Sequence, residues 1–159
     1  MSLLIKGADL LGAGRQDLLI RDGRIAEIGA LGAIRERGRE DAETIDADGL
    51  VALPGLVDIH THLREPGRED AETIASGSAA AAIGGFTAIL AMANTTPVTD
   101  TAEAAERILD LGRLAGLVDV QPVGAVTKGL MGEELAELGL MAASRARVRV
   151  FSDDGRCVH

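Results

Sequence analysis

The chain has 159 residues, of which 47% are hydrophobic and 26% are charged, and this composition is typical of a folded globular protein. Sixteen basic residues against 25 acidic ones give a formal net charge of −9, which argues against a nucleic-acid partner held through its phosphate backbone. A single cysteine, the lack of a signal-peptide pattern and the lack of an apolar run of roughly 18 residues argue against a disulfide framework, secretion and a membrane partner, so we expect a cytoplasmic protein.

Residues 1–55 predict a small β module made of short strands. Asp22-Gly23 separates two alternating segments, Asp17–Arg21 and Arg24–Ile28, and is a strong signal for a type I′ hairpin turn. Further short strands are predicted at Leu3–Lys6, Thr44–Asp46 and Leu50–Leu53. We expect this module, which resembles a β-sandwich, to be a separate domain.

From residue 56 to residue 159 the pattern changes to strands that alternate with helices. Such alternation predicts an α/β fold with a parallel sheet and right-handed crossovers. The predicted strands are Leu56–Ile59, Thr87–Ala93, Val118–Val126 and Arg147–Phe151, and the predicted helices are Glu69–Ile83, Thr101–Leu114 and Glu133–Ser144. About four βα units of this kind correspond to half of a (β/α)₈ barrel, which typically has about 250 residues.

Four strands cannot close a ring, so the first and the last would keep unpaired edges. The sequence also stops at Val158-His159 without a helix that could cover the last strand. We therefore expect the N-terminal part of a (β/α)₈ barrel that belongs to a longer protein. An open four-stranded α/β sandwich is the structural alternative, because 159 residues also suit one domain.

The segment GREDAETI occurs twice, at Gly38–Ile45 and at Gly67–Ile74. The first copy leads into a strand signal and the second into a helix signal, and there is no third copy that would indicate a solenoid. We predict different conformations for the two copies, since tertiary context overrides local propensity.

His60 and His62 are the leading candidates for metal ligands. They come directly after the residues Leu56–Ile59 and continue that strand. Residues two apart on a strand point to one face with Cα atoms about 6.7 Å apart. Both imidazoles can therefore reach one ion at a metal–nitrogen distance of about 2.0–2.1 Å. Asp58 is expected to support the strand or to orient an imidazole.

Polar side chains also follow the other predicted strands, where the catalytic loops of a parallel barrel gather. Arg64 follows the histidines, Asn94 follows the second strand, and Asp153 and Asp154 follow the fourth. Two imidazoles and a carboxylate make a good ligand set for zinc, and a carboxylate can also bridge two ions.

Each of these residues has a simpler interpretation when it is taken singly. Arg64 can form a surface ion pair with Glu65 or Glu69, worth about 0–1 kcal/mol. The asparagine and the two aspartates can be turn residues. Cys157 and His159 are interpreted as loop residues and not as ligands.

Together these segments resemble the amidohydrolase superfamily, specifically the bacterial class I dihydroorotases. The resemblance is carried by Pro54–Gly67 (PGLVDIHTHLREPG), Gly84–Thr87, Met92–Pro97 and Phe151–Gly155. The last segment is the most specific, because hydantoinase-type relatives generally place a carboxylated lysine at the bridging position and this segment contains no lysine.

The resemblance implies a reversible conversion of N-carbamoyl-L-aspartate to L-dihydroorotate in de novo pyrimidine biosynthesis, with two zinc ions in the complete site. His60 and His62 would bind the first zinc, and Asp154 would be shared between the ions, with Asp153 as the alternative. Arg64 and Asn94 would hold the substrate carboxylate, since the arginine fork matches a carboxylate bidentately.

The resemblance also implies that part of the machinery lies elsewhere. In this family two further histidine ligands and the aspartate that acts as general acid/base come later in the chain, so no catalytic residue is expected in this portion. We expect residues 1–159 alone to be inactive and to require the C-terminal half of the barrel. A homodimer and an aspartate carbamoyltransferase are further candidate partners.

Two alternative functions remain open at this point. A hydantoinase- or allantoinase-like amidohydrolase is disfavoured by Arg64 and by the missing lysine. A non-catalytic dihydroorotase-like subunit that supports aspartate carbamoyltransferase would be marked by lost metal ligands, whereas His60, His62 and Asp154 are present.

Overall fold

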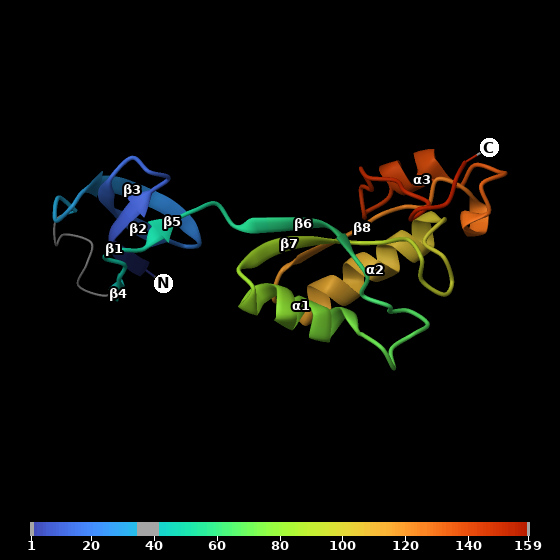
Figure 1. Cartoon of the computed structure of the whole chain (residues 1–159), viewed down its shortest axis with the longest axis horizontal. Coiled ribbons are helices and arrows are strands. Elements are labelled where there is room, and N and C mark those ends of the chain that lie inside the picture. The colour runs from blue at the N-terminus through green and yellow to red at the C-terminus, as the bar shows by residue number, and fades with distance from the viewer. Residues whose placement is uncertain (1, 35–41, 159) are drawn as a thin grey trace. The chain divides into compact units, whose positions relative to one another are not determined.

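The computed structural model describes residues 2–34 and 42–158. The chain divides into two compact units, Met1–Pro54 and Gly55–His159, whose helices and strands are labelled in Figure 1. No helix in the described ranges combines the length and the apolar character that crossing a bilayer requires.

The first unit is a five-stranded sheet. Antiparallel pairing joins β1, β2 and β3, whereas β4 and β5 both pair with β1 in parallel. Buried Leu4, Leu18 and Leu19 on β1 and β2 form the centre of its core. The strands are β1 (Ser2–Leu10), β2 (Arg15–Arg21), β3 (Arg24–Ala30), β4 (Ala42–Asp46) and β5 (Val51–Ala52).

The turn between β2 and β3 has the predicted type I′ geometry. Asp22 and Gly23 have φ angles of 50° and 73°, and positive φ at both central residues defines this turn. Its twist matches that of the strands on either side, and the two strands pair directly from Arg21 and Arg24. The hairpin prediction is therefore confirmed, and every other strand predicted in this part of the sequence is present with shifted ends.

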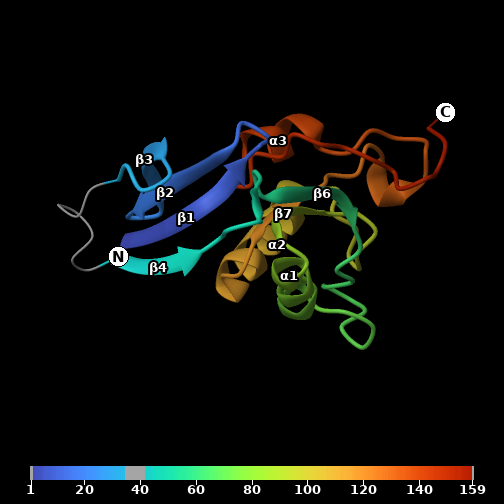
Figure 2. The same ribbon diagram turned by 60° about the vertical axis from the view of Figure 1, so that its left-hand side comes forward.

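The second unit is a three-stranded parallel sheet in the order β6-β7-β8, with crossover helices between its strands. α1 and α2 lie on the same face of this sheet (Figure 2). The elements are β6 (Leu56–Thr61), α1 (Ile74–Ile83), β7 (Phe86–Ala91), α2 (Ala102–Ala115), β8 (Asp119–Pro122), the 3₁₀ helix η1 (Lys128–Leu130) and α3 (Leu138–Ala143). The predicted parallel α/β pattern is thus present.

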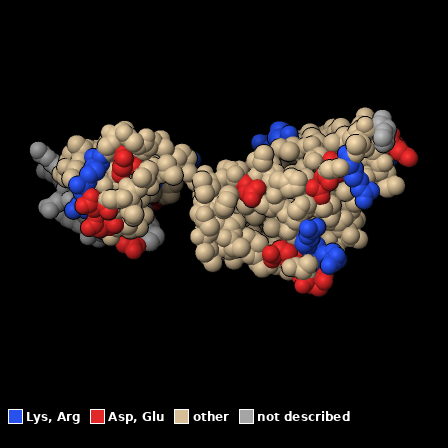
Figure 3. All heavy atoms as spheres, in the orientation of Figure 1, with Lys and Arg blue, Asp and Glu red and all other residues tan. Residues whose placement is uncertain are grey.

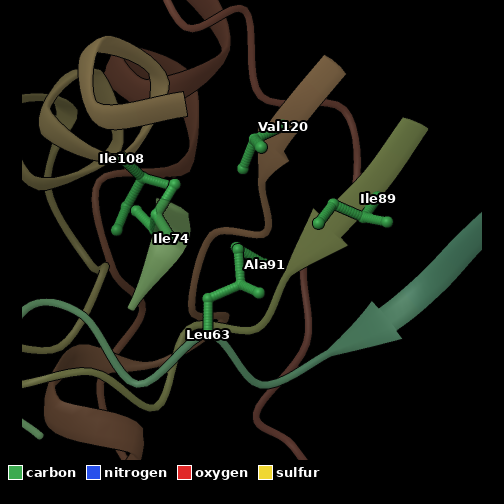
Figure 4. Close-up of a cluster of buried hydrophobic side chains, with 6 residues drawn as sticks. All are labelled: Leu63, Ile74, Ile89, Ala91, Ile108 and Val120. Atoms are coloured by element: carbon green, nitrogen blue, oxygen red, sulfur yellow. The ribbon is translucent and has the colours of Figure 1, made fainter. Parts of the chain in front are cut away.

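A cluster of buried apolar side chains holds α1 and α2 against the sheet (Figure 4). No member of this cluster is more than 6% exposed. Burying one large aliphatic side chain contributes about 1.5–3 kcal/mol, so the cluster dominates the stability of this layer. Its members are Leu63, Ile74, Ile89, Ala91, Ile108 and Val120.

α1 is shorter than the predicted helix Glu69–Ile83, because a capping box fixes its start at Thr73. The Thr73 hydroxyl accepts from the Ser76 N–H at 3.1 Å, and the Ser76 hydroxyl accepts from the Thr73 N–H at 3.1 Å. The second copy of GREDAETI therefore consists of turns that end in the first residue of α1, whereas Ala42–Ile45 of the first copy lie in β4. The prediction of different conformations is confirmed for these residues; the first four residues of the first copy lie outside the described ranges.

The predicted helix Glu133–Ser144 is wrong in its first half, and only α3 is formed. The Ala136 N–H donates to the Val126 carbonyl at 2.9 Å, and the Lys128 N–H donates to the Glu134 carbonyl at 2.8 Å. These bonds hold the segment before α3 against the loop that follows β8. The backbone groups that make them are therefore not available for helical hydrogen bonds.

The predicted fourth strand, Arg147–Phe151, is also wrong as an extended element. It is reduced to one parallel bridge between its last residue and Gly124. Arg147 has a φ of 47°, and the Val148 N–H donates to the Met141 carbonyl at 3.3 Å. The start of this segment is therefore bonded back to α3 and does not extend the sheet.

Gly112 allows α2 to approach β8 closely, because a Cβ at this position would lie 2.5 Å from the Val120 Cβ. We predict that Gly112→Ala lowers the free energy of unfolding by about 1–3 kcal/mol, since overpacking outweighs the helix propensity of alanine. Gly139→Ala in α3 is the matched control, because a Cβ there meets nothing within 4 Å. Urea denaturation measures both variants, and equal stability of Gly112→Ala and the parent would contradict the prediction.

Candidate metal centre

Three side chains from two distant parts of the sequence meet at one end of the parallel sheet. One ligand atom each from His60, His62 and Asp154 lies within 4.8 Å of the other two. The Oδ1 atom of Asp154 is 3.1 Å from the His60 Nε2 atom and 3.8 Å from the His62 Nε2 atom. The two imidazole rings have their centroids 5.1 Å apart, so both face the same space.

The histidines converge although β6 is irregular at this point. Between its pairs with β7, β6 advances from Asp58 to Thr61 while β7 advances only from Ile89 to Ala91. This extra residue makes a bulge, and bulges of this kind redirect side chains at active sites. The Asp58 carboxylate accepts a hydrogen bond from the His60 N–H at 3.0 Å and thereby holds the bulged backbone.

The two adjacent aspartates have different surroundings. Asp153 is buried, and its carboxylate accepts bonds from the Val126 N–H (2.8 Å), the Thr127 N–H (3.0 Å) and the Thr127 hydroxyl (2.5 Å). Asp154, with a φ of 51°, projects toward the two histidines instead. The structure therefore brings Asp154 and not Asp153 to the imidazoles.

The groups around Asp153 change the pKa of its carboxyl group. Burial alone raises the pKa of Asp153, but hydrogen bonds from Thr127 and Val126 and the nearby positive charge of Arg156 outweigh this effect. The pKa of Asp153 consequently lies below its usual range. Thr127 is fully buried and also accepts from the Gly132 N–H at 2.8 Å. No sequence signal singled out this threonine.

Asn94 lies in the loop that follows β7 and contacts two of the three converging residues. Its Oδ1 atom is 3.0 Å from the Nδ1 atom of His62, and its Nδ2 atom donates to the Oδ2 atom of Asp154 at 2.5 Å. These bonds join segments that are far apart in the sequence, so the interpretation of Asn94 as a local turn residue does not describe it.

Arg64 does not form the predicted surface ion pair with Glu65 or Glu69. Glu65 accepts from the Ile74 N–H at 2.8 Å, and Glu69 accepts from the Gly67 N–H at 2.9 Å. Among the described residues, no hydrogen bond or ion pair involves the half-buried Arg64 guanidinium.

Charges of both signs lie side by side on the surface of the loop between β6 and α1 (Figure 3). Arg68, by contrast with Arg64, pairs with Asp70 at 3.2 Å in this loop. Cys157, near the end of the chain, is exposed, and His159 lies outside the described residues.

The donor set fits zinc. Tetrahedral zinc with bonds of about 2.0–2.2 Å places neighbouring ligand atoms about 3.3–3.5 Å apart. The separations of 3.1 Å and 3.8 Å from Asp154 Oδ1 to the two Nε2 atoms lie on either side of this range. Two imidazoles and one carboxylate are also the donors that catalytic zinc sites use, with a position left for water or substrate.

Comparison with solved structures identifies the kind of fold. The L-hydantoinase (dihydropyrimidinase) of Arthrobacter aurescens matches 80% of this chain with a TM-score of 0.66 and 29% identity, and 29% of its own length is covered. A D-hydantoinase matches 80% of the chain with a TM-score of 0.64 and 31% identity, and 28% of its length is covered. Over this part of the chain, the fold is that of the amidohydrolases of the hydantoinase type.

Comparison of sequences identifies the family. A family described as dihydro-orotase-like matches residues 49–159. Proteins named dihydroorotase are 59% identical in Leifsonia xyli over 99% of this chain, and 58% identical in Mycobacterium tuberculosis over all of it. The chain belongs to the dihydro-orotase-like family. It spans about a third of the length of these relatives, 35% and 36% respectively.

Since the folded-state pKa of Asp153 is lowered, its stabilising effect is present above the unfolded-state pKa of about 3.9 and is lost as the pH falls through the folded-state value. We predict that Asp153→Asn lowers the free energy of unfolding at pH 7 by about 1–3 kcal/mol, because the amide nitrogen that replaces Oδ2 cannot accept from the Thr127 hydroxyl and the remaining bonds lose the negative charge. The difference should shrink below about pH 4. Urea denaturation between pH 7 and pH 3 measures both effects.

Asp119→Asn is the control for this prediction, because Asp119 is exposed on β8. Its effect should stay within about 0.5 kcal/mol at every pH. An Asp153→Asn variant that is as stable as the parent at pH 7 would show that the charge of Asp153 and its bond from the Thr127 hydroxyl are not stabilising.

Proposed function

We propose that the chain is part of a zinc-dependent dihydroorotase, a cyclic amidohydrolase that interconverts N-carbamoyl-L-aspartate and L-dihydroorotate in pyrimidine biosynthesis. The observation that carries this proposal is the convergence of His60, His62 and Asp154 in a chain whose relatives at 57–59% identity are named dihydroorotase. A cytoplasmic location, a homodimer and an aspartate carbamoyltransferase partner stay predictions from the sequence and from the resemblance.

His60 and His62 would hold the first zinc through their Nε2 atoms, and the Oδ1 atom of Asp154 would complete the ligands that this chain supplies. A second ion would share Asp154 in the complete site. Bound zinc would supply Lewis acidity toward a carbonyl oxygen and would lower the pKa of water, which is the chemistry that hydrolysis of a ring amide requires.

Arg64 and Asn94 would bind the carboxylate of the substrate. The Arg64 guanidinium is half-buried and has no partner among the described side chains, so its donors are available to a ligand. A planar guanidinium donates two parallel bonds to a carboxylate, which fixes the orientation of the ring as well as its position.

We further propose that β6, β7, β8 and the segment that bridges Gly124 to Phe151 are the first four strand positions of a (β/α)₈ barrel, and that residues 1–55 are the preceding β module. Apolar side chains on β6 support this, because Leu56, Val57 and Ile59 are 48%, 55% and 70% exposed. The relatives are long enough to supply four more βα units. The remaining ligands and the general acid/base would come from those units, so we expect residues 1–159 alone to be inactive.

The alternatives differ in substrate or in metal content. A hydantoinase-like enzyme is suggested by the solved neighbours, but the hydantoinases among them are 26–31% identical to this chain, against 45–59% for the proteins named dihydroorotase. A non-catalytic subunit would bind no metal at the centre. Zinc analysis of the full-length protein, together with assays on dihydroorotate, hydantoin and allantoin, distinguishes the three cases.

We predict that His60→Ala and Asp154→Ala in the full-length protein each lower turnover of dihydroorotate at least about 100-fold. Loss of a direct ligand should exceed the 10–100-fold effect that is typical of residues that only orient ligands. Zinc content after dialysis and initial rates measure the effect, with Asp119→Asn as the control. Full zinc content and full activity in both alanine variants would refute the assignment of the centre.

We predict that Arg64→Lys raises the KM for dihydroorotate about 10–150-fold, since a hydrogen bond to a charged group contributes about 1.5–3 kcal/mol and each 1.4 kcal/mol is a factor of ten. Lysine keeps the charge but loses the fork. Arg68→Lys, at an exposed arginine paired with Asp70, is the matched control and should leave KM unchanged. An unchanged KM for Arg64→Lys would remove Arg64 from substrate binding.

A further inference from the structure

We propose that Asn94 is a positioning residue that orients two metal ligands at once, His62 and Asp154. This inference rests on the proposed function, because it takes these two residues as ligands. It goes beyond the proposed contact of Asn94 with the substrate, since it assigns the amide a task within the protein itself.

The identity of each amide atom follows from Asp154. An ionised carboxylate can only accept hydrogen bonds, so the Asn94 atom 2.5 Å from the Oδ2 atom of Asp154 must be the amide nitrogen. The amide oxygen is then the atom that lies 3.0 Å from the Nδ1 atom of His62.

The same bond determines the tautomer of His62. A carbonyl oxygen carries no hydrogen, so the Nδ1 atom of His62 must be the donor. A neutral imidazole with its proton on Nδ1 has its lone pair on Nε2. That Nε2 atom is the one that lies 3.8 Å from the Oδ1 atom of Asp154. Asn94 thereby selects the form of His62 that can bind a metal in the centre.

Asn94 also determines which oxygen atom of the Asp154 carboxylate is left for a metal ion. It occupies the Oδ2 atom and leaves the Oδ1 atom, which faces the Nε2 atoms of His60 and His62 at 3.1 Å and 3.8 Å. One amide therefore holds the outer atom of each ligand and leaves the inner atom free. Partners that hold metal ligands in this way typically change metal affinity 10–100-fold when they are removed.

The backbone beneath Asn94 is rigid enough for this task. Ala93 is fully buried, and its carbonyl accepts from the N–H groups of Thr95 at 2.9 Å and Thr99 at 3.0 Å. The hydroxyls of these two buried threonines also bond each other at 3.0 Å. A side chain can orient others only when its own support is fixed by packing and hydrogen bonds.

The two roles of Asn94 are compatible. The amide nitrogen has two hydrogens, and one of them bonds Asp154. The second remains available to a substrate carboxylate. Asn94 would then contact both the substrate and the metal ligands through one planar amide group.

The test compares Asn94→Ala and Asn94→Asp with the parent in the full-length protein. Alanine removes both bonds, whereas aspartate keeps an oxygen opposite His62 but places a second carboxylate against Asp154. The imidazole ¹⁵N chemical shifts of His62 in the metal-free protein report the tautomer, and competition with a chelator reports the affinity for zinc.

We expect the parent to hold its His62 proton on Nδ1, and Asn94→Ala to release it to a mixture of tautomers. We expect zinc affinity to fall about 10–100-fold in Asn94→Ala. Asn94→Asp should keep the tautomer but lose zinc affinity through the altered Asp154. Gln121→Leu is the control, because it removes an amide whose bond goes to Asp119.

An unchanged His62 tautomer in Asn94→Ala would overturn the inference, and so would a changed tautomer with zinc affinity within twofold of the parent. Failure of the proposed function would look different, because the parent itself would then bind no zinc or would not turn over dihydroorotate. The tautomer, measured without metal, would still decide whether Asn94 orients His62. If Asn94→Ala does not fold, the zinc affinity of Asn94→Asp still tests whether Asn94 orients Asp154.

Discussion

The candidate centre depends on one buried carboxylate, that of Asp153. Its three hydrogen bonds to Val126 and Thr127 tie the segment after Phe151 to the loop that follows β8. Because Asp154 is the next residue in the chain, this attachment determines where its side chain can lie. Bonds that are buried and made to an ionised group are the strong ones, so the carboxylate beside the histidines is held by its neighbour and not by its own contacts alone.

The hydrophobic core fixes the histidine side of the centre. Leu63 directly follows His62 and is buried in the cluster that joins α1 and α2 to the sheet. A Cβ on Gly77 of α1 would lie 2.5 Å from the Leu63 side chain, so a larger residue at this position would displace that side chain. Packing on one side and Asn94 on the other therefore leave His62 little freedom. The centre lies where the core ends and the polar loops begin.

The predictable parts of the fold are those that depend on neighbours in the sequence. The Asp22-Gly23 turn and the alternation of strands and helices after residue 56 are read from local conformational preference and from the spacing of apolar residues. The ends of elements were less predictable. The start of α1 was set by the reciprocal bonds of Thr73 and Ser76. The strand expected at Arg147–Phe151 was lost at its start, because the Val148 N–H bonds Met141 in α3.

The same division applies to the site. The sequence by itself determined that His60 and His62 are close together, because residues two apart on an extended chain are close whatever surrounds them. Only the tertiary structure decided that Asp154 and not Asp153 joins them, and that Asn94 bonds to both sides of the centre. The physical reason is that a carboxylate or an amide goes to whichever donors and acceptors the fold places nearest, and those come from remote segments whose meeting no local pattern encodes.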